Sequence, residues 1–335
     1  MKTSDFDYHL PEELIAFYPL PKREESKLMV LTREDQKIEH RRFYEIPQFL
    51  KRGDVLVLNN TKVIPARLFG KTDTGRRLNI TLTERISPKL WKIIMKKPKN
   101  GMTVEFDNGL KAKVIKDGKK QWLIEFEEPA DNYIESFGKM PLPPYITREA
   151  EESDKISYQT VYAEEKGAIA APTAGLHFTN ELLDEIREKG VEIRHVTLHV
   201  GVGTFQPVKT DDIRQHDMHS EYREVPEETA FAVNRAKRGG RRIVAVGTTV
   251  VRALESAVDR AGSLRPAFGQ TDLFIYPGFE FRIVDALITN FHLPRSTLLM
   301  LVSAFAGGEF VLEAYRQAKE IGYRFLSYGD AMLIL

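Results

Sequence analysis

The pattern of apolar and polar positions divides the chain into stretches of different texture. In the first sixty residues, "KLMVLTR" (27–33) predicts a strand, and "DVLVLNN" (54–60), a nearly continuous apolar run, predicts a buried strand. From residue 77 to residue 128 the pattern changes to short segments, several of them alternating, with turns such as Asp117-Gly118 between them. Short strands at this spacing predict a small antiparallel barrel or sandwich.

Beyond residue 155, helical and strand patterns are mixed. Thr179 and Ser296 each precede a helical pattern as N-cap residues do, and glycines follow the ends of several helices. The expected helices cover 180–190, 226–240 and 249–262, a segment from Ser296, and 309–322, and the expected strands cover 191–200, 241–247, 272–278, 281–290 and 331–335. The simplest architecture is a mixed α/β core domain (1–62 plus 152–335) with an inserted small antiparallel β-barrel domain that includes a proline-rich connector (63–151).

Composition narrows the class of protein. The composition, 42% hydrophobic and 29% charged, is typical of a soluble globular chain, and the length of 335 residues predicts two domains, with one long domain as the alternative. The N-terminal segment lacks the apolar run of a signal peptide, and "STLLMLVSAFAGG" is too short to span a bilayer, so we expect a cytoplasmic protein without membrane contact. The absence of cysteine excludes disulfides, thiolate zinc sites, iron–sulfur clusters and cysteine nucleophiles.

Charge is unevenly distributed along the chain. The net charge is +1, but residues 71–120 contain 14 Lys and Arg against 5 Asp and Glu. Alternating lysines keep sheet edges soluble, yet this excess, with Trp91 and Trp122 interleaved, favours contact with a nucleic-acid backbone. The predicted contact residues are Arg76, Arg77, Lys92, Lys96 and Lys97.

Two strand ends carry candidate ligand contacts. In "VGTTVVRALES" a buried strand is followed by a helix start, where free N–H groups and the hydroxyls of Thr248 and Thr249 favour an anion, and Arg252 returns to the same side. In "TNFHLPRST", His292 and Arg295 lie at the end of a strand, where α/β proteins bind ligands. The alternative in both cases is an ordinary helix cap, with an exposed arginine in the second.

The stretch "APTAGLHFT" (171–179) places one imidazole among small residues. His177 precedes a helix N-terminus, whose dipole favours the neutral imidazole that a general base requires. The residues around it, Thr173 and Gly175 among them, leave room for a ligand to approach the backbone. A structural histidine that caps a turn is the alternative.

Three other patterns are weaker candidates. "GVGTFQ" (201–206) lacks the third glycine of a dinucleotide fingerprint and is followed by Pro207. His195 and His199 share one strand face, roughly 13 Å apart, and line a cleft or form a polar outer face. His216, His219 and Glu221 do not converge on either a helix or a strand, so no metal site is expected.

The combination of blocks along the chain resembles one family from end to end. "DFDYHLPEELIA", "DVLVLNNTKVIPARLFG", "APTAGLHFT", "HVGVGTFQPV", "MHSEYREV", "VGTTVVRALES", "TDLFIYPGFEF", "LITNFHLPRSTLLMLVSAFAG" and "YRFLSYGDAMLI" resemble the S-adenosylmethionine:tRNA ribosyltransferase-isomerases of queuosine biosynthesis. The resemblance is weakest across the basic insert.

The resemblance implies transfer of the ribosyl unit of S-adenosylmethionine to 7-aminomethyl-7-deazaguanine at a tRNA wobble position. The ribose is rearranged to an epoxycyclopentanediol, and adenine and methionine leave. A neutral base, for which His177 is the candidate, would generate a sulfonium ylide. Thr248, Thr249 and Arg252 would receive a polar part of the donor, and Arg295 the methionine carboxylate or a phosphate. The resemblance further implies a monomer with no cofactor besides the consumed donor.

Two other functions compete with this interpretation. An RNA-binding or ribosome-associated factor would use the basic barrel and ignore S-adenosylmethionine. A metal hydrolase built on His216, His219 and Glu221 would contain stoichiometric metal and lose activity with chelator.

Overall fold

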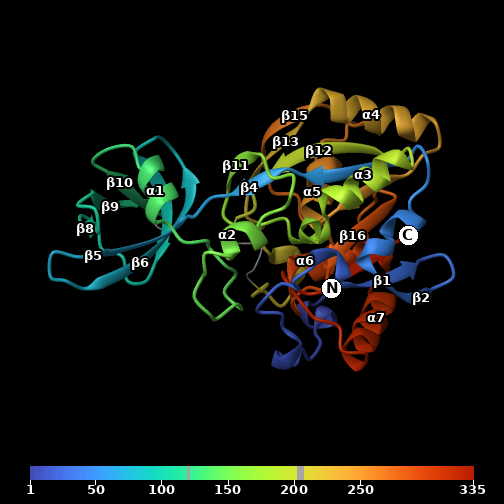
Figure 1. Ribbon diagram of the computed structural model, residues 1–335, viewed down its shortest axis with the longest axis horizontal. Coiled ribbons are helices and arrows are strands. Elements are labelled where there is room, and N and C mark those ends of the chain that lie inside the picture. Colours follow the sequence, from blue (N-terminus) through green and yellow to red (C-terminus); the bar gives the residue numbers. More distant parts are fainter. Residues whose placement is uncertain (119–120, 202–206) are drawn as a thin grey trace.

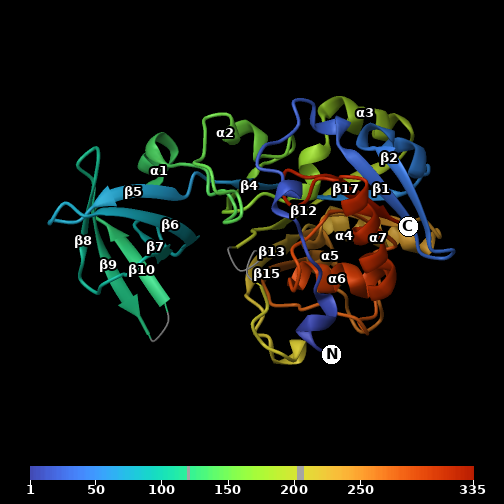
Figure 2. The same cartoon turned by 90° about the horizontal axis from the view of Figure 1, so that it is seen from below.

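The computed structural model describes residues 1–118, 121–201 and 207–335. They form a large α/β core and a smaller β-barrel that lies beside one end of the core in both views (Figures 1 and 2). The core contains both chain termini, and the barrel is a single continuous insert. The predicted fold class, a mixed α/β core with an inserted antiparallel barrel, is confirmed.

The core is organised around a nine-stranded mixed sheet of order β15-β13-β12-β3-β14-β16-β17-β1-β2. Its central strands β12, β3, β14 and β16 are parallel, and the pairs β16–β17, β1–β2, β12–β13 and β13–β15 are antiparallel. The strands are β1 (Lys27–Thr32), β2 (Lys37–Arg42), β3 (Val55–Asn59), β12 (Glu192–Leu198), β13 (Glu221–Val225), β14 (Ile243–Val246), β15 (Ala267–Thr271), β16 (Ala286–Asn290) and β17 (Ala331–Ile334).

Helices cover both faces of this sheet because its central strands are apolar throughout. In β3, Val55 and Val57 face one hydrophobic cluster, whereas Leu56 and Leu58 face another. The helices of the core are α3 (Asn180–Glu188), α4 (Glu227–Arg238), α5 (Thr248–Glu255), α6 (Thr297–Ala306) and α7 (Gly308–Glu320). Residues of α3 belong to the second cluster, and residues of α4 to α7 belong to the first.

The barrel is closed and antiparallel, in the order β10-β7-β6-β5-β8-β9. Its strands are β5 (Arg67–Lys71), β6 (Arg77–Arg85), β7 (Leu90–Met95), β8 (Thr103–Phe106), β9 (Lys111–Asp117) and β10 (Gln121–Phe126), and helix α1 (Asp131–Phe137) follows them. Alternation directs Leu78, Ile80 and Leu82 of β6 into a hydrophobic core that is separate from those of the α/β domain.

The two connections between barrel and core lie side by side. Arg67 at the entry and Lys139 at the exit exchange backbone hydrogen bonds of 3.1 and 2.9 Å. On the core side, β4 (Thr61–Val63) pairs in parallel with β11 (Glu165–Ala168), and the short helix α2 (Asp154–Ser157) precedes β11. Met140 and Ile146 of the connector pack against core residues such as Tyr328. The domain boundaries at 62/63 and 151/152 stay a prediction.

Three predicted elements differ from the structure, and one of them is the strand expected over 281–290, which begins only at Ala286. The segment 272–278 is not a strand: its apolar side chains, Leu273 and Phe274 among them, pack against the core without ladder hydrogen bonds, and the strand β15 comes just before it. The helix expected over 249–262 ends at Glu255, where a β-bridge between Val258 and Leu264 follows.

In the part of the chain that the structure describes, no single helix is long and apolar enough to cross a membrane. The helices α6 and α7 reach that length and composition only together, across a bend of 112°.

Candidate functional site

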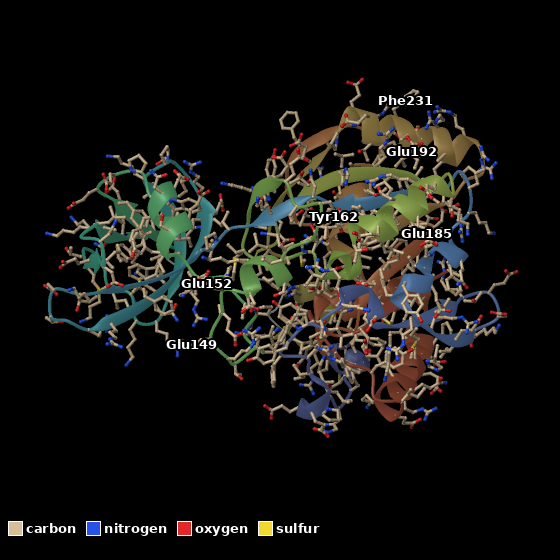
Figure 3. The ribbon with its side chains drawn as sticks, in the orientation of Figure 1. Glu149, Glu152, Tyr162, Glu185, Glu192 and Phe231 are labelled. Atoms are coloured by element: carbon tan, nitrogen blue, oxygen red, sulfur yellow. The ribbon has the colours of Figure 1, made fainter. Side chains whose placement is uncertain are left out.

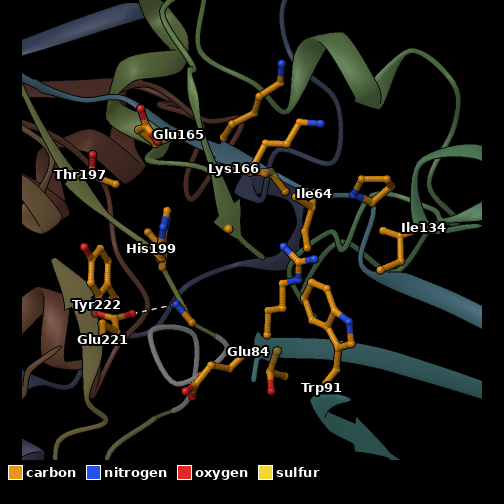
Figure 4. Close-up of a pocket in the computed structure, with 18 of the residues that line it drawn as sticks. Ile64, Glu84, Trp91, Ile134, Glu165, Lys166, Thr197, His199, Glu221 and Tyr222 are labelled. Atoms are coloured by element: carbon orange, nitrogen blue, oxygen red, sulfur yellow. Dashed lines mark hydrogen bonds between the residues drawn. The ribbon is translucent and has the colours of Figure 1, made fainter. Parts of the chain in front are cut away.

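A large cavity of about 880 Å³ lies at the boundary between barrel and core (Figure 4). Volumes in this range are typical of ligand sites. The barrel contributes Glu84, Arg85 and Trp91, whereas β4, β11, β12, β13 and β15 contribute the core side. The barrel lies next to these strands because it is inserted directly after β4, whose Lys62 and Val63 line the cavity.

Several charged side chains that line this cavity form ion pairs with each other. Arg85 pairs with Asp131 at 2.8 Å, and Lys166 pairs with Glu135. The Arg85 guanidinium also lies 5.9 Å from the ring centroid of Trp91. The indole N–H of Trp91 is buried and has no hydrogen-bond partner among the described residues.

His199 and Tyr222 form an aromatic wall on the core side of the cavity (Figure 4). Their ring centroids are 5.5 Å apart with an angle of 22° between the planes. The Oγ1 of Thr61 lies 2.7 Å from Nδ1 of His199, which fixes the ring. Burial lowers the pKa of His199, so this imidazole is neutral at pH 7.

Below this wall, Glu221 and Arg252 form a buried ion pair. Both side chains are 4% exposed. Glu221 accepts a hydrogen bond from the backbone N–H of Gly201 at 2.8 Å, and Arg252 donates to the carbonyl of Leu273 at 3.0 Å. Glu221 lines the large cavity, but Arg252 does not. The substrate contact predicted for Arg252 stays a prediction, and the structure gives this guanidinium structural partners.

A second, smaller cavity of about 60 Å³ gathers four residues that were predicted separately. Thr173, Thr248, Thr249 and His292 all line it. Thr248 and Thr249 follow β14 and His292 follows β16, and the carboxyl ends of these neighbouring parallel strands lie at one sheet edge. Thr173 reaches the same cavity from the segment after β11, and its hydroxyl donates to Asn290 at the end of β16. Val200 lines this cavity as well as the large one. A volume of 60 Å³ accommodates a group of a few atoms and not a whole nucleoside.

The start of α5 forms one wall of the small cavity. Gly247 precedes the helix with φ +92°, a conformation that favours glycine, and a Cβ there would lie 3.5 Å from Oγ1 of Thr249 and 3.8 Å from Cβ of Ala174. The Oγ1 of Thr249 lies 3.3 Å from Nδ2 of Asn59. His292 is held by Thr289 at Nε2, and burial lowers its pKa to about 3.

His177 lies beside the small cavity and lines a third cavity of about 460 Å³. Asn290 links the two sites: its Oδ1 accepts from Thr173 at 2.8 Å, and its Nδ2 lies 3.2 Å from Nε2 of His177. Nδ2 also donates to the carbonyl of Asp330 at 3.4 Å, which establishes it as the amide nitrogen.

The tautomer of His177 follows from this network. Because Asn290 donates to Nε2, that nitrogen is the acceptor, and the proton resides on Nδ1, which donates to Oγ of Ser26 at 2.8 Å. The ring is 5% exposed and packs 4.9 Å from Phe43. Burial lowers the pKa of His177 to about 4. The imidazole is therefore neutral, and the lone pair of its Nε2 faces Asn290.

Two other predicted residues lie outside the three cavities. A Cβ at Gly175 would lie 2.0 Å from the hydroxyl of Tyr162, so glycine permits this close contact. Arg295, with φ +56°, pairs with Asp7 and is 54% exposed. Their predicted substrate contacts stay predictions.

The predicted tRNA contacts separate into two groups on the barrel. Arg77 opens β6, whereas Arg85 at the other end of the same strand lines the large cavity, roughly 26 Å away. Arg76 precedes β6, and Lys96 and Lys97 follow β7, whose Met95 pairs with Ile80, so these residues belong to the end far from the cavity. Lys92 lies near the cavity and pairs with Glu84 at 2.6 Å.

Of the weaker candidates, His199, Gly201 and Glu221 line the large cavity. Within 1–118, 121–201 and 207–335, no group of three or more His, Asp or Glu residues could hold a metal ion. His216 packs against the ring of Phe274, and His195 against that of Tyr162. Apart from Gly201, the "GVGTFQ" turn lies outside the described residues.

Several residues of the two cavities were not predicted from the sequence. Asn290 ends β16, a position that signals ligand contact, but the contact predicted from this stretch was His292, two residues further on. Tyr222 and Gln270 are paired on β13 and β15 and both face the large cavity, and Lys166 lines it from β11. These positions can be recognised only when the strand pairing is known.

The chain is similar to known proteins over its whole length. The family model described as queuosine biosynthesis protein matches residues 3–334. Proteins named S-adenosylmethionine:tRNA ribosyltransferase-isomerase are 52% identical in Aquifex aeolicus, over 340 residues, and 53% identical in a Sulfurihydrogenibium species, over 340 residues, with both chains covered completely. A crystal structure of S-adenosylmethionine tRNA ribosyltransferase from Thermotoga maritima matches 99% of this chain and 100% of its own, with 42% identity and a TM-score of 0.58.

Proposed function

Since the chain belongs to the queuosine biosynthesis protein family, we propose that it is an S-adenosylmethionine:tRNA ribosyltransferase-isomerase. It transfers and isomerises the ribosyl moiety of S-adenosylmethionine onto 7-aminomethyl-7-deazaguanine at the wobble position of a tRNA. The products are epoxyqueuosine-tRNA, adenine and methionine. The observation that carries the proposal is the cavity of about 880 Å³ between barrel and core, which shares Val200 with a small cavity lined by Thr173, Thr248 and Thr249.

The two cavities suit two substrates that must meet. The large cavity has the volume for a nucleobase extruded from an RNA loop together with most of a nucleoside donor. The small cavity, with the hydroxyls of Thr173 and Thr248, suits a polar end of S-adenosylmethionine. The donor then extends past Val200, with its ribose toward the RNA.

The catalytic step that we assign to a side chain of this protein is removal of a proton from the donor. His177 is the proposed base that removes a proton from the carbon next to the sulfonium, and its neutral state at pH 7 supports this role. The Nε2 lone pair accepts a hydrogen bond from Asn290 in this structure, so Asn290 must release it before Nε2 accepts a proton. The ribosyl donor is consumed, and the proposed reaction requires no resident cofactor.

The RNA contacts the barrel in this proposal. Arg76, Arg77, Lys96 and Lys97 carry no ion pair among the described residues and are available for phosphates of a stem that extends along the barrel. The cytoplasmic location and the monomeric state expected from the sequence are part of the same proposal.

The decisive experiment combines the purified protein, S-adenosylmethionine and a tRNA that carries 7-aminomethyl-7-deazaguanine. We expect adenine and methionine to be released in equal amounts, only when this tRNA is present. A tRNA with unmodified guanine at the same position is the matched control and should release neither.

The competing functions give different results in the same assay. An RNA-binding factor would bind the tRNA and release no adenine. A metal hydrolase would contain stoichiometric metal and lose its activity with chelator. Either result contradicts the proposal.

A further inference from the structure

The cavity face of the core sheet carries two rows of side chains that run across three strands. Thr197 pairs with Glu224, which in turn pairs with Phe268. In the neighbouring row the backbone N–H of His199 donates to the carbonyl of Tyr222 at 3.0 Å, and Tyr222 pairs with Gln270. Directly paired residues project to the same face of a sheet. Phe268 lies beyond the rim of the large cavity, and the other five side chains line it: Thr197, His199, Tyr222, Glu224 and Gln270.

Phe268 is unusually exposed for an aromatic residue. Its side chain is 85% exposed, the largest value among the large hydrophobic side chains that the structure describes. It lies on β15, the edge strand of the nine-stranded sheet. An exposed aromatic ring on an edge strand promotes aggregation and contributes nothing to the core, so the folded chain by itself gives no reason for it.

The position of this ring relates it to the cavity. Along β15, Phe268 is two residues from Gln270, a separation of about 7 Å, and across the sheet it neighbours Glu224 at about 5 Å. A nucleotide next to one whose base occupies the cavity therefore lies within reach of the ring. Aromatic side chains that stack on unpaired bases are a common means of holding single-stranded RNA.

We propose that Phe268 is a stacking platform for the unpaired nucleotide adjacent to the one whose base enters the large cavity. The inference rests on the proposed function, because it takes the occupant to be an RNA loop. It adds a binding position outside the cavity, which holds the neighbouring base while the reactive base is extruded.

A second copy of this chain is a poorer occupant. A stable protein interface buries about 800 Å² on each partner, whereas one aromatic ring offers about 200 Å². The neighbours of Phe268 on the same face, Glu224 and Gln270, are polar. One isolated ring amid polar groups matches the area of one base.

The first test compares Phe268→Ala with the wild-type protein in the adenine-release assay. We expect the KM for tRNA to rise about fivefold or more, with an unchanged KM for S-adenosylmethionine and an unchanged Tm, because the side chain is exposed. Phe268→Trp should keep the wild-type KM. Phe231→Ala is the matched control: this ring is 61% exposed on α4, outside the cavity lining (Figure 3).

The second test removes the partner base. In anticodon stem–loops with an abasic site on either side of the reactive nucleotide, one of the two sites should raise the KM of the wild-type protein. The same abasic site should have no further effect on Phe268→Ala, since that variant has no ring on which the base could stack.

Three results would overturn the inference. The first is an unchanged KM for tRNA in Phe268→Ala, and the second is an equal rise of this KM in Phe231→Ala. The third is that Phe268→Ala elutes from size-exclusion chromatography as a smaller assembly than the wild-type protein, which would identify a second copy of the chain as the occupant. Each applies only if the wild-type protein releases adenine. A wild-type protein that releases none refutes the proposed function instead.

Discussion

Asn290 and His177 lie 113 residues apart in the sequence, yet the amide of Asn290 donates to Nε2 of His177 over 3.2 Å. The same amide accepts from Thr173, which lines the small cavity. One side chain thus fixes the tautomer of the proposed base and contacts the proposed donor site. A substitution of Asn290 would therefore affect both the proposed base and the proposed donor site.

Replacement of His177 by Ala should abolish adenine release. Loss of a general base reduces turnover by about 10² to 10⁴. The measurement is the rate of adenine release at saturating substrates, with tRNA binding measured separately and expected to persist. Ser26→Ala, which removes the acceptor of the Nδ1 proton, is the milder comparison. Near-normal turnover of His177→Ala would exclude this residue as the base.

Acidification should destabilise the fold through two buried histidines. Burial lowers the pKa of His177 to about 4 and that of His292 to about 3, both below the ordinary value of 6.5. The unfolded chain therefore binds more protons than the folded chain between these values, and stability is lost as pH falls through 6.5. Each histidine should cost about 2 kcal/mol at pH 5.

The measurement is the free energy of unfolding in urea at pH 8 and pH 5. His292→Asn should reduce the difference between the two values by about 2 kcal/mol, because asparagine does not titrate. An unaltered pH dependence in this variant would show that His292 is not buried in neutral form.

Replacement of Arg252 by Ala should destabilise the fold. It breaks the buried ion pair between Arg252 and Glu221, and removal of one partner of a buried pair typically costs about 3–5 kcal/mol. The double variant Arg252→Met with Glu221→Gln should recover much of this loss, since the glutamine still accepts from Gly201. Urea unfolding measures both. If Arg252→Ala instead raised the KM for S-adenosylmethionine at unchanged stability, the ligand contact predicted from the sequence would be correct.

Neutralisation of the distal end of the barrel should weaken tRNA binding. Arg76→Gln with Arg77→Gln should raise the Kd for tRNA and reduce the slope of log Kd against log salt by about 1 for each phosphate that is no longer neutralised. The KM for S-adenosylmethionine should not change. Lys111→Gln, on β9 of the same barrel, is a control for general charge. An identical salt slope in the double variant would remove this end of the barrel from the RNA interface.

Local sequence signals predicted much of the fold. Thr179 and Ser296 cap α3 and α6 through their hydroxyls, at 3.1 and 3.2 Å from the N–H groups of Leu182 and Leu299. The strand β15 was missed because "AFGQT" has neither alternation nor a continuous apolar run, and its edge position leaves Phe268 in solvent. The apolar segment after it resembled a strand because its side chains are partly buried, although its backbone forms no ladder.

The site was predictable in part, for a physical reason. Thr248 and His292 follow buried strands, and strand ends at one edge of a parallel sheet must lie near each other. The partner of Arg252 was not predictable, because its contact with Glu221 depends on how α5 packs against β13. The large cavity was not predictable either, because its walls depend on how the barrel is placed against the core.

Val200 lines both cavities, so a ligand in either cavity would lie against the same residue. Two ligands that share such a contact are subject to reciprocity. If the bound donor changes the affinity for RNA by some factor, the bound RNA changes the affinity for the donor by the same factor. The binding of the two substrates can then be coupled through contact with this one valine, without a domain movement.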